Sequence, residues 1–502
     1  MRTQIVLKNS YWGIISQLVI LLIGFISRKI FLDTLGPSYL GLNGLFSNII
    51  SLLSLAELGI SSAIIYYLYK PLLEKNQEEI TQLMNFYKSS YRIIASIIAT
   101  LGLLFLPFIE IIVKDSPFTL IYLNLIFLLF LVEAVTSYFF SYKRSIIFAD
   151  QKNYIIIKYD TLFRVLTEII NIIVLIHTQN FIFYLIIRIL VKLINNYVIA
   201  VIADEKYPYI NNKEKLDKHK KRNIFKNIKY IMINKLSWTI TSSTDNIIIS
   251  SFINLNTVGL MANYNMIILA VQNLVLQILN SSQASVGDLL VKDSKANILM
   301  ILNRMTFFSF FVGSFCGVSL YVLINPFITL WIGSNYLLNE YIVGILVLNF
   351  FLLLLRTPLW QMIGASGLFK QDKDIAILGT VINLLISLIL VKVIGLFGVL
   401  LGTLISLIIQ IALKIPLFFK CFLKIKFFNY FFTSLAFILL FIVEAGITSY
   451  ISSKVLISND FISLSINIIL CIIIPNLINI MLFKKNIHFT FFLALIKGIL
   501  KK

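Results

Sequence analysis

Acidic side chains lie inside long apolar stretches of the sequence, where they could bind a proton or a sodium ion. Glu57 lies in the stretch 40–69, and Asp245 lies in the stretch 229–253. A carboxylate at the middle of a membrane helix costs about 3 kcal/mol on insertion scales, so it should face protein or water. At helical spacing, Glu57 shares one narrow arc with other polar residues, which are Asn43, Ser47, Ser54 and Ser61. We therefore interpret Glu57 and Asp245 as candidate ion-coupling residues, with packing as the alternative for Glu57. Glu133 has no such polar arc, and we expect it to make a packing contact.

Basic side chains also lie inside apolar stretches. Arg164 falls between Asp160 and Glu168 at i, i+4 spacing, so either acid can neutralise it within one helix. Arg188 and Lys192 lie one turn apart on the next apolar stretch, which carries no acid of its own. Like charges one turn apart repel, so these two need acidic partners, solvent or an anionic ligand. We predict a cationic patch that binds an anionic group and consists of Arg28, Arg164, Arg188 and Lys192.

These charges must be positioned by helices, because the rest of the chain is strongly apolar. Of its 502 residues, 59% are hydrophobic, and the mean hydropathy is +0.92, whereas soluble proteins are roughly 45–50% apolar. Continuous apolar runs of about 20 residues predict an all-α polytopic membrane protein, and a β-barrel would need alternating runs instead. We predict about fourteen membrane helices, at 10–31, 40–69, 83–113, 118–142, 154–176, 182–203, 229–253, 259–284, 298–325, 340–362, 374–393, 396–419, 428–452 and 461–483.

The net charge of +20 indicates the orientation of the chain rather than nucleic-acid binding. Most Lys and Arg residues lie in alternate loops, and positive loops stay on the cytoplasmic side, so both termini should be cytoplasmic. Related segments recur at an interval of roughly 220 residues, as around Gly41 and Gly259, which predicts two six-helix lobes in parallel repeat. The predicted parts are a first lobe, a basic cytoplasmic linker, a second lobe, two extra helices and a basic amphipathic tail, at 1–203, 204–228, 229–426, 427–483 and 484–502.

The sequence lacks the common motifs of enzymes and metal sites. Its three cysteines and three histidines have no metal-ligand or disulfide spacing. It also contains no Walker A, GxGxxG, HExxH or GxSxG pattern. We therefore predict no catalytic residue, no metal site and no bound cofactor.

Several segments resemble a known family of membrane proteins. They are Phe25–Phe31, Leu35–Gly36, Tyr39–Leu42, Ala56–Ile60, Ala365–Leu368 with Lys370 and Asp372, and Gly395–Thr403. In their order and spacing they are similar to the Wzx-type polysaccharide repeat-unit flippases of the multidrug/oligosaccharidyl-lipid/polysaccharide (MOP) exporter superfamily. The similarity runs over essentially the whole chain.

This resemblance implies two six-helix lobes around a central cavity, with alternating access. It implies transport of undecaprenyl diphosphate carrying a short oligosaccharide, from the inner to the outer leaflet of the bacterial plasma membrane. The driving force would be a proton or sodium gradient, and a polysaccharide polymerase is a candidate partner besides membrane lipids. The family brings no motif that assigns single residues to the site, so the cationic patch is a prediction from the residues themselves.

Two other classes of function compete with this interpretation. A cation-coupled multidrug antiporter of the same superfamily would use one or two buried acids, here Glu57 and Asp245, as its ion site. A membrane-embedded glycosyltransferase or polymerase would need catalytic residues in large external loops. The predicted external loops are short and nearly free of charge, which argues against that third class.

Overall fold

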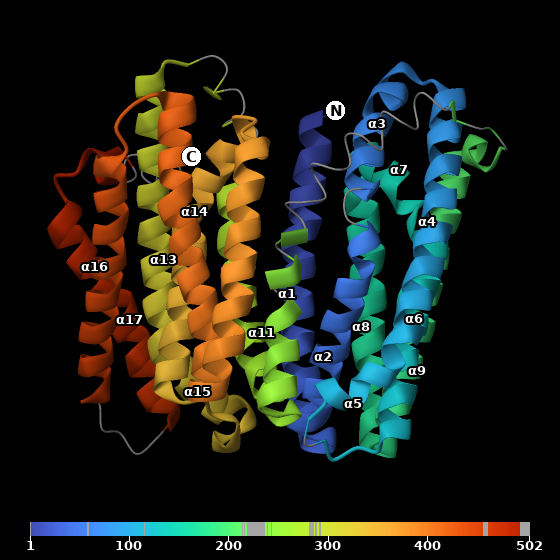
Figure 1. The fold of residues 1–502 in the computed structure, drawn as a ribbon, viewed down its shortest axis with the longest axis horizontal. Coiled ribbons are helices and arrows are strands. Elements are labelled where there is room, and N and C mark those ends of the chain that lie inside the picture. Colours follow the sequence, from blue (N-terminus) through green and yellow to red (C-terminus); the bar gives the residue numbers. More distant parts are fainter. Residues whose placement is uncertain are drawn as a thin grey trace. The chain divides into compact units, whose positions relative to one another are not determined.

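The described part of the chain is built from helices (Figure 1). The computed structural model describes residues 2–57, 60–114, 116–212, 214, 216–217, 236–237, 239–241, 243–280, 286, 289–290, 293–454 and 460–491. No strand occurs within these ranges. The predicted all-α fold is therefore confirmed.

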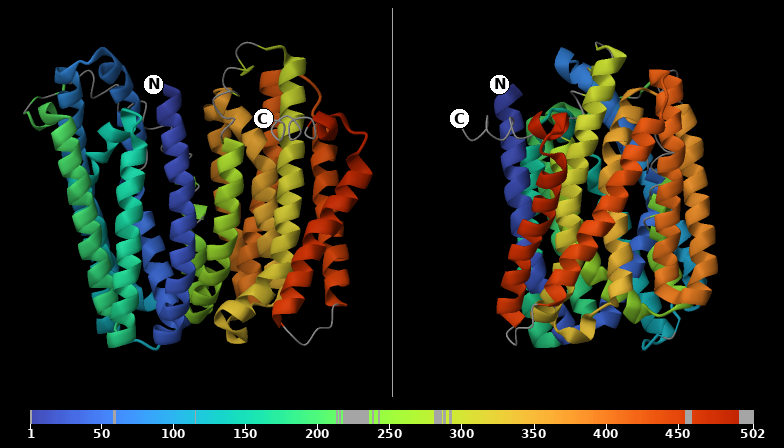
Figure 2. Two further views of the ribbon diagram at one scale, coloured as in Figure 1. Left: turned by 180° about the vertical axis from the view of Figure 1, so that it is seen from behind. Right: turned by 90° about the vertical axis from the view of Figure 1, so that its left-hand side faces the viewer.

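Eleven helical segments of the described chain are long and apolar enough to cross a membrane. Most of them run nearly parallel within their own part of the structure, as two further views show (Figure 2). The helices in question are α1 (Arg2–Leu35), α4 (Gln77–Phe105), α6 (Leu120–Ser141), α8 (Asn153–Thr178), α9 (Phe181–Lys206), α11 (Leu255–Asn280), α13 (Lys295–Ile332), α14 (Glu340–Ala365), α15 (Phe369–Phe418), α16 (Phe428–Ser453) and α17 (Asp460–Phe483). The prediction of a multi-pass membrane protein is confirmed.

One of these elements contains two of the predicted helices. The backbone of α15 leaves helical geometry at Ile394 and at Gly395, where φ is 58°. Glycine adopts this left-handed conformation without the steric cost that a side chain would bring. The kink falls between the predicted helices 374–393 and 396–419, and the chain turns back there. The two spans lie side by side, because Asn383 donates to Thr403 and Ser387 donates to the carbonyl oxygen of Val399. The predicted helix 229–253 lies partly outside the described residues, although 243–252 is helical.

The predicted helix 40–69 is wrong as a continuous element. It is divided into α2 (Pro37–Leu53), a 3₁₀ turn η1 (Ser54–Glu57) and α3 (Ile60–Glu74). The side chain of Ser54 can compete for backbone hydrogen bonds at the end of α2, so the apolar pattern continues where the α-helix does not. The arc of polar residues is consequently interrupted at Glu57, and the side chain of Ser61 lies outside the described residues.

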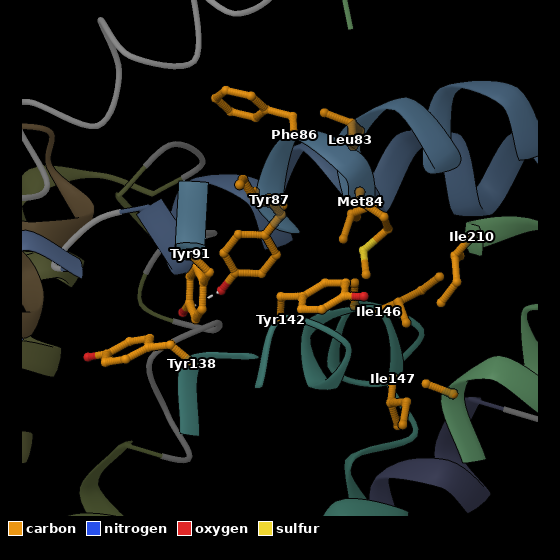
Figure 3. Close-up of a cluster of buried hydrophobic side chains, with 14 of the residues drawn as sticks. Leu83, Met84, Phe86, Tyr87, Tyr91, Tyr138, Tyr142, Ile146, Ile147 and Ile210 are labelled. Atoms are coloured by element: carbon orange, nitrogen blue, oxygen red, sulfur yellow. Dashed lines mark hydrogen bonds between the residues drawn. The ribbon is translucent and has the colours of Figure 1, made fainter. Parts of the chain in front are cut away.

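The chain divides into two compact units, Met1–Gly259 and Leu260–Lys502. In the first unit, α1 packs on α8, α8 on α9, α9 on α6 and α6 on α4. A buried cluster joins α3, α4, the short helix α7 (Arg144–Ala149) and η3 (Pro208–Asn211). Met84, Tyr87, Ile146 and Ile210 are among its members (Figure 3). This core fixes the helices that carry the intramembrane charges.

The predicted division at the basic linker stays a prediction, because most of 213–235 lies outside the described residues.

In the second unit, α13 is the central helix, with α14, α16 and α17 packed against it. Phe310 of α13 stacks on Phe437 of α16 with ring centroids 4.3 Å apart. Glu444 of α16 is fully buried and accepts a hydrogen bond from Ser314 of α13. The two helices predicted to follow the second lobe are thus packed into this unit. Of the predicted tail, Lys484–Phe491 is described, and Arg304 of α13 lies over the ring of Phe491.

Candidate functional site

The two cations of α9 bind an acid that comes from α6. Glu133 Oε2 accepts hydrogen bonds from Nε and Nη2 of Arg188 at 3.0 and 2.7 Å. Its Oε1 atom accepts a hydrogen bond from Nζ of Lys192 at 2.9 Å. The prediction that Glu133 makes only a packing contact is therefore wrong. An acidic partner was one of the three expected ways to balance Arg188 and Lys192, and this acid lies on another helix, 55 residues from Arg188 in the chain. The sequence feature that could have identified Glu133 as a charge-pairing residue is its position inside an apolar stretch, which is the feature that identified Glu57.

Arg188 also connects α9 to α2. Its Nη1 atom donates a hydrogen bond of 2.7 Å to Oδ1 of Asn43. Its guanidinium lies 4.6 Å from the ring centroid of Phe130, one turn before Glu133 on α6. The side chains of Glu133 and Arg188 are 14% and 18% exposed, whereas that of Lys192 is 45% exposed. Arg188 therefore joins three helices, and Lys192 presents the more accessible charge.

A second cationic group lies where α1 packs on α8. Arg164 forms an ion pair of 2.9 Å with Glu168, whose side chain is 8% exposed against 55% for Arg164. Ser27 of α1 donates a hydrogen bond of 2.5 Å to the same carboxylate. Arg28, the next residue on α1, lies within electrostatic range of Glu168 and Arg164. The predicted i, i+4 pair of Arg164 with Glu168 is present.

The other predicted pair, between Asp160 and Arg164, is wrong. Asp160 instead receives two hydrogen bonds from Arg144 of α7, at 2.8 and 2.9 Å. Asn195 of α9 donates a third, at 2.7 Å. A guanidinium that reaches both oxygens of a carboxylate makes a stronger contact than a single donor does. Glu168 is thus the acid that Arg164 binds.

The structure brings the predicted cations of the first unit into one region. Tyr184, one turn before Arg188 on α9, lies within electrostatic range of Arg28, Arg164 and Arg188. Lys192 follows one turn after Arg188 and shares Glu133 with it. Among the described residues, these four cations lie with the acids Glu133 and Glu168, and the neighbouring Asp160 is bound by a further cation, Arg144, so cations outnumber acids in this set. In a medium of low dielectric constant, such an excess favours an anionic ligand.

Glu57 has a different environment, formed by neutral phenols. Its two carboxylate oxygens accept hydrogen bonds from the hydroxyls of Tyr91 and Tyr138, the latter at 2.8 Å. Tyr87 donates to the hydroxyl of Tyr91 at 2.7 Å (Figure 3). Tyr87 and Tyr91 thus form a chain that ends at one oxygen of Glu57, and Tyr138 binds the other oxygen. Asp245, the other predicted ion-coupling residue, is half-buried in the helical stretch 243–252. The roles of both acids stay predictions.

A comparison with protein families assigns the chain. A model described as polysaccharide biosynthesis protein matches residues 6–282, which is more than half of the chain. The chain belongs to the polysaccharide biosynthesis protein family. No curated protein shows a sequence match to it. This family agrees with the resemblance of the sequence to polysaccharide repeat-unit flippases.

Solved structures with the same fold include a flippase and MATE transporters. A lipid II flippase, MurJ, in an inward closed conformation matches with a TM-score of 0.69 and 16% sequence identity, covering 95% of this chain and 99% of its own. An inward-facing multidrug resistance MATE transporter of the MOP superfamily matches with a TM-score of 0.56 and 17% identity, covering 80% and 97%. A MATE transporter of Vibrio cholerae matches with a TM-score of 0.57 and 15% identity, covering 85% and 99%. This member of the polysaccharide biosynthesis protein family therefore has the fold of this flippase and these MATE transporters.

Proposed function

We propose that the protein moves undecaprenyl diphosphate-linked oligosaccharide repeat units from the inner to the outer leaflet of a bacterial plasma membrane by alternating access. The excess of cations in the first unit is the observation that carries this proposal. Among the described residues, Arg28, Arg164, Arg188 and Lys192 lie with the two acids Glu133 and Glu168. A diphosphate is a small, highly charged group that arginine and lysine bind well. The transported units would then be used in surface polysaccharide synthesis, with a polysaccharide polymerase as a candidate partner.

We further propose that a proton or sodium gradient drives this movement through Glu57, with Asp245 as a second ion-coupling residue. The phenol donors of Tyr91 and Tyr138 stabilise the carboxylate of Glu57 without neutralising its charge. Each carboxylate oxygen has a second lone pair besides the one that faces a phenol, and the coupling ion can bind there. This coupling role is separate from the proposed role of the cationic patch.

The alternative function is that of a multidrug antiporter, which would require a binding region of the opposite charge. An antiporter for cationic drugs needs an acidic binding region, because like charges repel the substrate. The first unit instead carries more cations than acids around Tyr184 and Glu133. This charge balance favours the anionic lipid-linked substrate.

Deletion of the gene in its source bacterium tests the proposal directly. Undecaprenyl diphosphate-linked repeat units should accumulate on the cytoplasmic side, and plasmid-borne wild-type protein should remove them. Lipid extracts analysed by mass spectrometry, from intact spheroplasts with and without an impermeant glycosidase, would report both amount and sidedness. Unchanged lipid intermediates together with increased drug susceptibility would support the antiporter instead.

A further inference from the structure

Glu133 binds two cations, but it binds them unequally. One of its oxygens, Oε2, accepts two hydrogen bonds from Arg188, whose donors belong to a single rigid plane. The other oxygen, Oε1, accepts a hydrogen bond from the ammonium group of Lys192. Two donors from one planar group lose less conformational freedom per bond than a donor at the end of a flexible stem. The contact with Lys192 is therefore the easier one to exchange.

Arg188 is also held by the protein in other directions. Asn43 accepts from its third nitrogen, and Phe130 covers one face of the guanidinium. These contacts use three of the five N–H donors of Arg188 and fix its guanidinium in place, so Arg188 can offer a ligand its remaining donors but cannot turn toward it. Lys192 can turn, because its side chain is almost half exposed and an ammonium group has three donors.

Building on the proposed function, we propose that Glu133 is a positioning residue that holds Lys192 at the site and competes with the lipid-linked diphosphate for its ammonium group. Arg188 keeps the carboxylate of Glu133 ionised and in place. When the diphosphate enters, Lys192 turns from Glu133 to a phosphate oxygen, and when it leaves, the carboxylate takes the ammonium group back. A transported ligand must bind well enough to enter and weakly enough to leave, and this competition limits the binding strength.

Replacing the acid by its amide separates this role from a structural one. Glu133→Gln keeps the size of the side chain and removes the competing charge. Affinity for undecaprenyl diphosphate should then rise about fivefold, the scale of a partly exposed ion pair, and the maximal rate of flipping should fall by a similar factor because release is slower. A purely structural role would lower the amount of folded protein without tightening binding.

Two further variants define the mechanism. In the double variant Glu133→Gln with Lys192→Gln, the gain in affinity should disappear, because no ammonium group is set free. Glu133→Asp keeps the charge that Arg188 needs but shortens the reach to Lys192, so affinity should rise about twofold. Glu110→Gln, at an exposed acid of the short helix α5 (Ile109–Ile112), is the matched control and should leave both values unchanged.

The measurements use the full-length protein, with labelled undecaprenyl diphosphate binding in lipid nanodiscs and flipping in proteoliposomes. If the wild-type protein does not bind undecaprenyl diphosphate, the proposed function itself fails. If the wild type binds and Glu133→Gln leaves affinity unchanged or lowers it, the competition is wrong. Should Glu133→Gln not fold, Glu133→Asp decides, and an affinity equal to or below that of the wild type overturns the proposal.

Discussion

Gly41 of α2 and Gly259 of α11 cross at direct backbone contact within the first unit. A Cβ atom on Gly41 would collide with the carbonyl oxygen of Leu255, and one on Gly259 would collide with that of Pro37. The contact is reciprocal, because each glycine faces the residue four positions before the other. The two segments that the sequence singled out as repeats thus meet each other at this crossing.

We expect Gly41→Ala to destabilise this crossing, because the added methyl group forces the backbones apart. The cost should be about 1–3 kcal/mol, the range for overpacked sites. Thermal unfolding of the purified protein in detergent measures it. Gly364→Ala in α14 is the control, since a Cβ atom there meets no atom within 4 Å, and it should be neutral or slightly stabilising. Equal midpoints for the two variants would contradict the prediction.

We expect Lys192→Gln to abolish most transport while membrane levels stay normal, because Lys192 is partly exposed and makes one described ion pair. Arg188→Gln should also lower stability, by about 3 kcal/mol, because it leaves Glu133 without its buried partner. Arg188→Lys should retain part of the activity. Complementation of the deletion strain and blotting of membranes measure both effects. Lys158→Gln, at an exposed lysine of α8, is the control. Normal surface polysaccharide from the Arg188→Gln, Lys192→Gln double variant would eliminate this site.

Glu57→Gln should uncouple transport from its driving ion, since the amide keeps the shape of the side chain but cannot titrate. Initial rates in proteoliposomes should lose their dependence on the proton or sodium gradient. Tyr138→Phe removes one hydrogen-bond donor to Glu57 and keeps the acid, so it should change the rate less than the loss of the carboxylate does. A variant Glu57→Gln that transports at the normal rate, with unchanged pH and sodium dependence, would show that the coupling residue lies elsewhere.

The orientation can be tested with single cysteines in a background without the three native ones. Lys75→Cys and Lys152→Cys should be shielded from an impermeant thiol reagent in intact cells, because positive loops stay in the cytoplasm. Ser38→Cys and Ser116→Cys should react. Permeabilised cells provide the control, in which Lys75→Cys and Lys152→Cys must also react. Labelling of Lys152→Cys in intact cells would reverse the proposed orientation.

Acid should loosen the packing of Lys484–Phe491 on α13. Burial lowers the pKa of His488, and the nearby positive charge of Arg304 lowers it further. The folded state therefore favours the neutral histidine. The contact of Lys484–Phe491 with α13 should be most stable above the ordinary histidine pKa of about 6.5, and it should become less stable as the pH falls below that value. Proteolysis of the tail at pH 7.5 and 5.5 measures the effect. His488→Gln should remove the difference between the two pH values, and a difference that persists would assign it to another group.

The sequence alone determined the class of fold and which charges are unusual. Runs of apolar residues set the length and number of membrane helices, because the thickness of the bilayer requires them. Gly395 marked the boundary between two predicted spans, and the backbone leaves helical geometry at that residue. Arg188, Lys192 and Glu57 were found because a charge inside an apolar run stands out from its surroundings. These features depend on residues that are neighbours in the chain, so they can be read from it directly.

The partners of these charges were decided by the tertiary structure. The spacing along α8 allowed Arg164 to bind either Asp160 or Glu168. In the structure, Asp160 is instead bound by Arg144 of another helix. Arg188 and Lys192 had no acid on their own helix, and Glu133 reached them from α6. Helical periodicity specifies which side chains share a face of one helix, but not which helix packs against that face. The acid that meets a buried cation therefore becomes known only when the helices are placed together.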